Sequence, residues 1–234
     1  MAALVGTLLP GLPLAGLTAA AAEELNQLTP AQASAGWKLL FDGQTTAGWR
    51  GFKQPSFPTK GWVVEEGCLK HLPKGGGGDI VTVGQYKEFE FEADWRIGPT
   101  ANSGIKYFIL EERGSAIGHE YQIIDALGAE DAKLDAKQHT ASFYDVLAPA
   151  VPPPQRPLDE FNHTRIVVRG NHVEHWLNGV KVLAYELGSD EVRAAVAKSK
   201  FRNVSGFGTL VLGHILLQDH GGEVWFRNLR IRPL

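Results

Sequence analysis

The chain has 234 residues, of which 44% are hydrophobic and 21% charged, and its formal net charge is −3. This is the composition of a globular protein that can bury a sizeable core, and a single β-sandwich domain of this length is ordinary. No cluster of Lys and Arg stands out, so nucleic acid is not expected as a partner.

Residues 1–22 differ in character from the rest of the chain. They contain no charged residue, are rich in Leu, Ala and Gly, and end in Ala20–Ala22, a run of small residues of the kind that a signal peptidase accepts. The stretch is too short, and too interrupted by Pro10 and Pro13, for a membrane span. We expect a signal peptide at 1–22, a linker at 23–35 and one domain at 36–234, in a periplasmic or secreted protein.

From Gly36 onward the chain alternates between short strands and turns. In Phe89–Ile97, apolar residues alternate with acidic residues and Arg96, which predicts a strand with one apolar face and one ionic face. Asn178-Gly179 is typical of a type I′ hairpin, and only 189–199 has the capping and charge pattern of a helix. Further strands are expected at 37–41, 61–71, 104–110, 120–125, 164–168, 173–177, 181–185, 208–212 and 224–231. The pattern predicts an all-β sandwich of two antiparallel sheets with one short helix.

The run Gly75–Gly78 predicts a loop. It lacks the Lys-Ser/Thr pair of a P-loop and no helix signal follows it, so no nucleotide cofactor is expected. The sequence also has no His-Glu-x-x-His and no paired Cys. An oxygen-rich metal site built from Glu120, Asp125 and a His on different strands stays open.

The expected polar strand faces carry ionisable and amide side chains that could line a groove. Strand parity places Glu120 and Gln122 on one face. His220, in Gln-Asp-His-Gly-Gly, and His139, in Lys-Gln-His-Thr, suit proton transfer near neutral pH, or else serve as ordinary loop histidines. The remaining polar residues on these faces are Arg96, Lys106 and His175.

Several blocks in this order resemble the 3-keto-disaccharide hydrolase domain family. They are Trp37–Gly43 with Gly48-Trp49, Phe89–Arg96, Asn102–Ile105, Gly118–Asp125, His175–Gly179, Ile215–Gly221 and Phe226–Ile231. The resemblance implies a concanavalin A-like (lectin/glucanase) jelly roll with the sugar groove on its concave sheet. It also implies a carbohydrate substrate that a separate sugar 3-oxidoreductase, the pathway partner, has already oxidised at C3.

The chemistry implied by the resemblance is elimination, by a hydrolase or a lyase. The 3-keto group acidifies the C2 proton, so a base removes it and the C1 substituent leaves, after which water addition completes a net hydrolysis. Some members need a divalent metal. On this basis His220 or His139 is the expected base and Glu120 the acid or a metal ligand. Arg96 or Lys106 would stabilise the enolate. The hydroxyl-binding candidates are Asn102, Gln122, His175 and Gln218.

Two other functions remain as alternatives. A conventional two-carboxylate glycosidase would pair Glu120 with Glu92 or Asp94 across the groove. A non-catalytic carbohydrate-binding module would instead stack sugars on exposed aromatic rings, for which the candidates are Trp49, Phe52 and Phe57.

Overall fold

A computed structural model describes residues 24–125 and 134–234. The expected signal peptide at 1–22 lies outside the described residues. No helix within them is long and apolar enough to cross a membrane.

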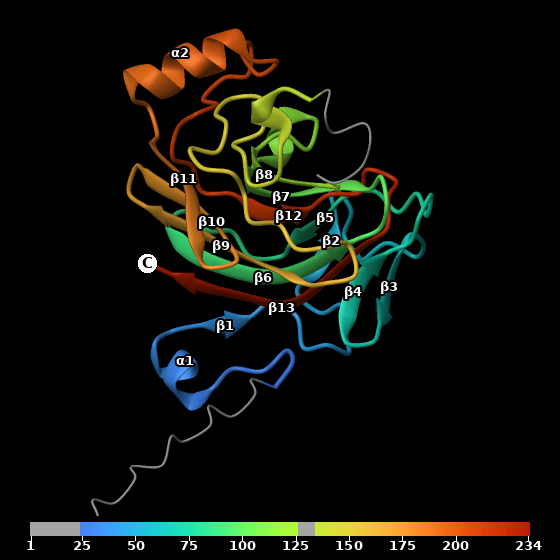
Figure 1. The fold of residues 1–234 in the computed structure, drawn as a ribbon. Coiled ribbons are helices and arrows are strands. Elements are labelled where there is room, and N and C mark those ends of the chain that lie inside the picture. Colours follow the sequence, from blue (N-terminus) through green and yellow to red (C-terminus); the bar gives the residue numbers. More distant parts are fainter. Residues whose placement is uncertain (1–23, 126–133) are drawn as a thin grey trace, which may run out of the picture.

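Thirteen named strands of the described residues form two antiparallel sheets that pack face to face (Figure 1). The large sheet has the order β11-β10-β9-β6-β13-β4-β3, with β1 paired to β13. Its strands are β1 (Lys38–Leu39), β3 (Trp62–Glu65), β4 (Cys68–His71), β6 (Phe89–Ile97), β9 (Asn162–Arg169), β10 (His172–Leu177), β11 (Val180–Glu186) and β13 (Val224–Pro233).

The small sheet has the order β2-β5-β12-β7-β8. Its strands are β2 (Trp49–Gly51), β5 (Ile80–Thr82), β7 (Asn102–Ile109), β8 (His119–Ile124) and β12 (His214–Leu217). The all-β jelly-roll expectation is confirmed. The strand expected at 208–212 is not observed. Gly208 lies in a turn, residues 210–212 have no regular structure, and β12 begins only at His214.

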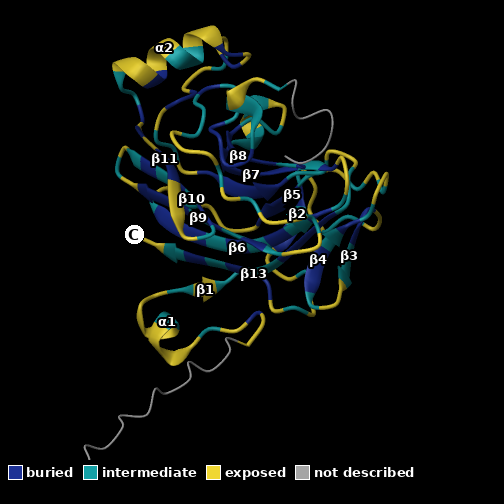
Figure 2. Cartoon of the chain, viewed as in Figure 1, coloured by how far each residue is buried: buried dark blue, intermediate teal, exposed yellow. Residues whose placement is uncertain are grey.

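The core lies between the two sheets. Apolar residues alternate with polar ones along each strand, so the apolar side chains, many of them aromatic, all point into this space. Phe89, Phe91 and Trp95 of β6 face Ile105 and Tyr107 of β7, and all five are fully buried. Each buried ring of this kind contributes about 1.5–3 kcal/mol. Figure 2 shows the buried residues concentrated in the two sheets and the exposed residues in the helices and loops. The polar residues of β6 therefore face outward from the large sheet.

Two short helices lie outside the sandwich. Helix α2 (Asp190–Lys198) begins at the N-cap Ser189, whose hydroxyl accepts from the Val192 N–H, as its sequence predicts. Helix α1 (Pro30–Ser34) lies in the segment expected as a linker. That segment is anchored to the large sheet, because the buried Asn26 exchanges two backbone-to-side-chain hydrogen bonds with Asn228 of β13, at 2.7 and 2.8 Å.

Candidate active site

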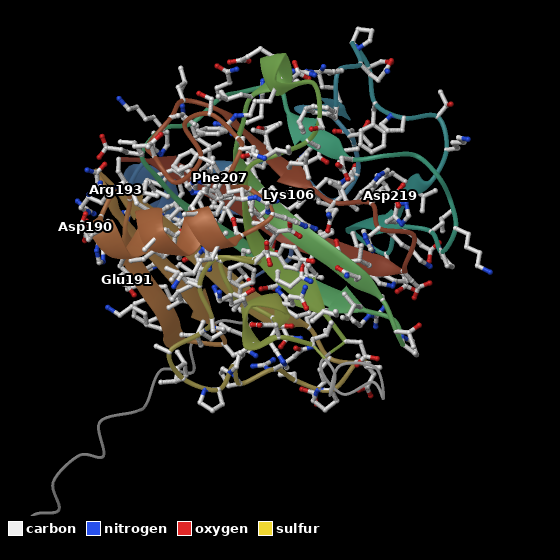
Figure 3. All side chains as sticks on the ribbon, turned by 90° about the horizontal axis from the view of Figure 1, so that it is seen from above. Lys106, Asp190, Glu191, Arg193, Phe207 and Asp219 are labelled. Carbon is white, nitrogen blue, oxygen red and sulfur yellow. The ribbon has the colours of Figure 1, made fainter. Side chains whose placement is uncertain are left out.

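A polar cavity of about 310 Å³ lies on the small sheet, on the face turned away from the core. Neighbouring strands supply its floor: Lys106 of β7 is directly opposite Glu120 of β8, and Gly104 is directly opposite Gln122. Side chains at opposed positions of an antiparallel pair point to the same face, about 5 Å apart. The cavity is lined by Asn102, Lys106, Ala116, Ile117, Gly118, Glu120, Gln122, Tyr144, Lys200, Phe201, Val204, Gln218 and His220. In the view of Figure 3, Lys106 lies in the middle of this face and Asp219 on the loop to its right.

Glu120 is the centre of the cavity floor. Lys106 Nζ lies 3.6 Å from its Oε2. The side-chain amides of Gln122 and Gln218 are oriented so that their NH₂ groups face the Glu120 carboxylate. Gln122 then donates to Glu120 Oε1 at 3.1 Å, and Gln218 donates to the same oxygen at 3.3 Å. In that orientation the Gln218 oxygen also accepts from Lys106 Nζ at 2.9 Å. One carboxylate oxygen is thus fixed by amides, while the other faces an ammonium group.

Gly104 makes room for this arrangement. A side-chain carbon at position 104 would lie 2.7 Å from Glu120 Oε1, closer than real contacts allow. The carbonyl of Gly104 in turn accepts the Gln218 N–H at 3.0 Å, which fixes the end of β12 beside the floor. Gly104 therefore leaves the space that the Glu120 side chain occupies.

A second wall comes from connecting segments rather than from strands. The loop after η3 (Ala136–Gln138) runs along the edge of β8, where the Tyr144 N–H donates to the Glu120 carbonyl at 3.0 Å. Lys200 follows α2, and its backbone N–H donates to Asp145 Oδ2 at 2.6 Å. Its ammonium lies 4.2 Å from the centroid of the Tyr144 ring. The wall thus adds a phenol and a second cation to the floor groups.

The electrostatics of the cavity centre on the buried carboxylate. Burial raises the pKa of Glu120, while the charges of Lys106 and Lys200 act in the opposite direction. Burial also lowers the pKa of Lys200, although Glu120 and Asp145 favour its charged form. The pKa of Tyr144 is raised by burial and by the negative charge of Glu120. Such mutual perturbation in a cavity is typical of functional sites.

Asp79, which directly precedes β5, adds a half-buried carboxyl group near this floor. Its Oδ1 accepts the Asp219 N–H at 2.9 Å, and burial raises its pKa against the influence of Lys106 and His220. Asp219 accepts the N–H groups of Gly78 and Gly221, at 2.8 and 2.9 Å, and lies 2.9 Å from the buried His71. This network connects the glycine-rich loop to the loop that carries His220.

The structure brings together six of the nine residues singled out from the sequence. They are Asn102, Lys106, Glu120, Gln122, Gln218 and His220. Tyr144, Lys200 and Asp79 were not anticipated, because Tyr144 and Lys200 lie on connecting segments without periodicity and Asp79 directly follows the glycine run. At such a position nothing in the sequence pattern distinguishes a titratable residue of the site from one on the surface.

Three expected site residues lie elsewhere. His175 is fully buried in the core, where it contacts the Tyr107 hydroxyl at 2.9 Å and the Ala141 carbonyl at 3.0 Å. It shares its strand face with Val173 and Leu177, so it cannot bind a sugar in the cavity. Arg96 lies on the outer face of the large sheet, over the Trp225 ring at 4.6 Å. His139 ends η3 and does not line the cavity.

The residues named for the two alternatives are also placed elsewhere. Glu92 and Asp94 lie on the outer face of the large sheet, where Glu92 pairs with Arg230 at 2.6 Å and Asp94 with His163 at 2.8 Å. Neither faces Glu120 across the cavity. Trp49 is buried in the core, whereas Phe52 and Phe57 are partly buried against apolar clusters. None of the three offers an exposed ring platform.

The residues around Glu120 do not fit a divalent metal ion. Among the described residues no three His, Cys, Asp or Glu side chains gather as ligands. Two ammonium groups already balance the Glu120 charge, and Asp125, expected as a ligand, instead accepts the Thr100 N–H at 2.9 Å. The positive charges of Lys106 and Lys200 beside Glu120 disfavour a further cation there.

The chain is similar to several known proteins in sequence and in fold. A 3-keto-disaccharide hydrolase of Bacteroides thetaiotaomicron is 34% identical over 245 residues, covering 91% of this chain and 83% of that protein. A crystal structure of a candidate glycosyl hydrolase from Parabacteroides distasonis is 31% identical, with a TM-score of 0.80 over 90% of this chain and 100% of that one. A second structure from the same organism, 24% identical, has a TM-score of 0.69 and shows the same fold.

The family match spans nearly the whole domain. Residues 36–232 match the family described as the 3-keto-alpha-glucoside-1,2-lyase-like domain. That range contains both sheets, apart from the last residue of β13, and every residue that lines the cavity around Glu120. With this match and a relative more than 30% identical along most of both chains, the chain belongs to the 3-keto-alpha-glucoside-1,2-lyase-like family.

Proposed function

We propose that this protein cleaves glycosides that carry a ketone at C3, by removing the C2 proton and expelling the C1 substituent. The observation that carries the proposal is the buried Glu120 carboxylate beside Lys106 and Lys200 at the floor of the cavity. The family description and the name of the 34% identical relative support the substrate class. A cavity of about 310 Å³ is at the small end of ligand sites and suits one sugar ring.

The reaction demands three groups in a fixed order along the sugar ring. A base takes the C2 proton, a cation stabilises the negative charge that develops on the C3 oxygen, and an acid protonates the oxygen that leaves C1. C2 and C3 are adjacent, so the base and the cation must be neighbours. Glu120 and Lys106 meet this requirement because their side chains are opposed on adjacent strands.

Glu120 is the base in this proposal. Its Oε1 is held by Gln122 and Gln218, which leaves Oε2 as the oxygen that meets the substrate. Burial makes a carboxylate more basic, because it raises the free energy of the charged form. Lys106 and Lys200 then stabilise the enolate oxygen at C3. Their charge becomes most effective as the proton moves to Glu120 and negative charge passes to the sugar.

His220 is the acid that serves the leaving oxygen. It is exposed at the rim of the cavity and joins the floor through Gln218 and Asp219 of the same loop. The C1–O bond breaks as the leaving oxygen takes the His220 proton, and a 1,2-unsaturated 3-keto sugar remains. Addition of water returns a hydroxyl to C1 and a proton to C2, so the net change is hydrolysis.

The proposal includes two statements about the protein's surroundings. The 3-keto group must be made by a sugar 3-oxidoreductase that acts upstream, since no redox step occurs in the elimination. Export to the periplasm or medium is supported by the uncharged, small-residue composition of Met1–Ala22.

Solvent deuterium incorporation tests the mechanism. The purified protein is incubated in D₂O with methyl 3-keto-glucoside and with unoxidised methyl glucoside. Elimination followed by water addition leaves deuterium at C2 of the released 3-keto-glucose, and the unoxidised glycoside stays intact. Free 3-keto-glucose with the same protein controls for exchange after release. Release from the parent glycoside overturns the proposal. So does cleavage of the keto compound that neither leaves solvent deuterium at C2 nor is slowed by deuterium at C2 of the substrate; the second measurement covers return of the same proton by Glu120.

A further inference from the structure

A buried histidine outside the cavity contacts the loop of His220 at two points. His71 ends β4 of the large sheet, and its fully buried ring packs edge-on against the Trp62 ring, with 5.0 Å between the ring centroids. Nδ1 of His71 donates to the Gly222 carbonyl at 2.9 Å, and Nε2 lies 2.9 Å from Asp219 Oδ1. His220 lies between Asp219 and Gly222 in the sequence, so one imidazole holds the chain on both sides of it.

Asp219 connects His71 to the rest of the loop. Its Oδ1 also accepts the Gly221 N–H at 2.9 Å, and its Oδ2 accepts the Gly78 N–H at 2.8 Å. Burial raises the pKa of Asp219, but these N–H groups and His71 outweigh burial and lower it overall. The carboxyl group is therefore ionised at neutral pH, and a carboxylate favours a proton on the nitrogen that faces it. The contact between His71 and Asp219 is thus an ion pair that is almost completely buried.

The His220 ring depends on the loop backbone for its position. It is exposed at the cavity rim, and among the residues that the structure describes none makes a hydrogen bond or ion pair with it. The backbone that follows it rests against Ala101, directly before β7, since a side-chain carbon at Gly222 would lie 2.7 Å from the Ala101 Cβ. The place of the imidazole is therefore set by the backbone around it, and His71 holds that backbone from the core.

We infer that His71 is a positioning residue for the proposed reaction, which holds His220, through Asp219, where the oxygen that leaves C1 takes its proton. The inference rests on the proposed function, in which His220 is that proton donor. His71 itself does not line the cavity. A displaced acid slows the step in which the C1–O bond breaks, whereas removal of the C2 proton depends on Glu120. Methoxide needs a proton to leave and 4-nitrophenolate does not, so dependence on the leaving group distinguishes positioning of the acid from a general structural role.

Two substitutions of His71 separate its two contacts. In His71→Asn the amide nitrogen takes the place of Nδ1 and can still donate to Gly222, but it does not reach Asp219. In His71→Gln the amide nitrogen takes the place of Nε2 and keeps a donor to Asp219. His71→Asn should lower kcat for methyl 3-keto-glucoside by about tenfold, a part of what a well-placed acid contributes, and leave kcat for 4-nitrophenyl 3-keto-glucoside unchanged. His71→Gln should restore most of the activity on the methyl glycoside.

Three further variants complete the experiment. His220→Gln removes the acid and should show the same selective loss on the methyl glycoside, at least as large. Asp219→Asn alters the contact from the half-buried loop side and should reproduce the loss even if His71→Asn does not fold. His175→Gln is the control, because it changes a buried imidazole of the same sheet that does not contact the loop, and it should leave both rates unchanged.

The outcomes separate the positioning role from the activity on which it rests. If the unaltered protein cleaves neither substrate, or if His220→Gln causes no selective loss, the proposed function or its acid fails and the inference fails with it. If His220→Gln slows only the methyl glycoside, while the His71→Asn and Asp219→Asn variants slow both substrates equally or neither, the positioning role alone is overturned.

Discussion

Glu120 holds the key position because its two oxygens have different surroundings. Oε1 lies among the amides of Gln122 and Gln218, while Oε2 faces Lys106. Burial favours the protonated carboxyl and the lysines favour the carboxylate, with burial the larger effect on the pKa. A group balanced in this way can both accept and return a proton, which the elimination and the later water addition require.

Replacing Glu120 by Gln tests this role. The amide has nearly the same shape but cannot accept the C2 proton, so kcat for a 3-keto-glucoside should fall by about 10²- to 10⁴-fold. Calorimetric titration with the same keto compound should show that binding is retained. Glu160→Gln, at an exposed position, is the matched control and should leave kcat unchanged. A Glu120→Gln variant with normal kcat would contradict the assignment of the base.

Lys200 is predicted to limit activity at high pH. It is an exposed residue, but its ammonium group lies over the Tyr144 ring, and burial of that group lowers its pKa. With 4-nitrophenyl 3-keto-glucoside, whose leaving oxygen needs no proton from His220, kcat/KM should decline at a pH below the usual 10.5 of lysine, because deprotonated Lys200 no longer helps Lys106 to stabilise the enolate. The Lys200→Arg variant keeps its charge and should extend activity to higher pH. Lys198→Arg is the control. If kcat/KM declines at the same alkaline pH in the unaltered protein and in Lys200→Arg, Lys200 is not the titrating group.

At the scale of elements, the small sheet is positioned by side-chain links between segments distant in the sequence. Arg50 of β2 binds Glu111 of η1 (Glu111–Arg113) through two hydrogen bonds, at 2.7 and 3.0 Å. The Lys53 N–H also donates to Glu111, at 2.7 Å. This link joins β2 to the segment that leads from β7 to the cavity residues Ala116–Gly118.

The link between Arg50 and Glu111 should make stability depend on pH. Its hydrogen bonds, above all that from Arg50, lower the pKa of Glu111 from 4.5 to about 2. A lowered folded pKa stabilises the protein above the unfolded value of 4.5, and that stabilisation is lost as the pH falls towards 2. Because Glu111 is partly exposed, Glu111→Gln should cost only about 1 kcal/mol at pH 7.

Urea unfolding at neutral and acid pH measures this contribution. The difference between the unaltered protein and Glu111→Gln should shrink as the pH falls from 4.5 to about 2. The neighbouring Glu112→Gln, which removes an exposed carboxylate, should show no such convergence. A difference that stays constant over this range would mean that the pair does not act through ionisation of Glu111.

The strand pattern predicted the faces of the elements but not the sheet to which each belongs. Parity placed Glu120 and Gln122 together on a polar face, and the cavity contains both. The same reasoning put Arg96 on a polar face correctly, but that face belongs to the other sheet. Sheet membership depends on long-range pairing, such as Arg96 with Trp225, which no local period encodes.

For two residues the sequence signal was of a different kind. His175 lies two residues from both Val173 and Leu177, on the same strand face, so strand parity already indicates a buried position for it. Lys200 offered no pattern at all, since it enters the cavity only because the segment after α2 is bound to Asp145. Loop-borne site residues depend on tertiary contacts and are the hardest to predict.

At the scale of the whole molecule, the core between the sheets contains imidazoles as well as apolar side chains. His119 of β8 accepts the Gly208 N–H at Nε2, at 3.0 Å, and is packed among aromatic rings. His175 of β10 donates to the Ala141 carbonyl from Nδ1, so its Nε2 accepts from the Tyr107 hydroxyl. Both rings are neutral in the fold, because each accepts a hydrogen bond at Nε2.

This core makes the protein sensitive to mild acid. Burial lowers the pKa of His119 to about 3 and that of His175 to about 4, from 6.5. A lowered folded pKa of a histidine means that the unfolded chain binds more protons below 6.5, so stability is full above that pH and declines below it. At pH 5, which is 1.5 units lower, each ring should cost about 2 kcal/mol, a large part of a typical folding free energy of about 5–15 kcal/mol.

Replacing His175 by Gln separates titration from packing. The amide can both donate to Ala141 and accept from Tyr107 but does not titrate, so the loss of unfolding free energy between pH 7 and pH 5 should shrink by about 2 kcal/mol.

His172→Gln is the control. Glu186 raises the pKa of this half-exposed histidine, so the stabilisation that His172 contributes is present below pH 6.5 and lost as the pH rises. The His172→Gln change should therefore not reduce the loss of unfolding free energy between pH 7 and pH 5. If urea unfolding shows the same loss for His175→Gln as for the unaltered chain, the buried imidazole of His175 is not what makes the fold acid-sensitive.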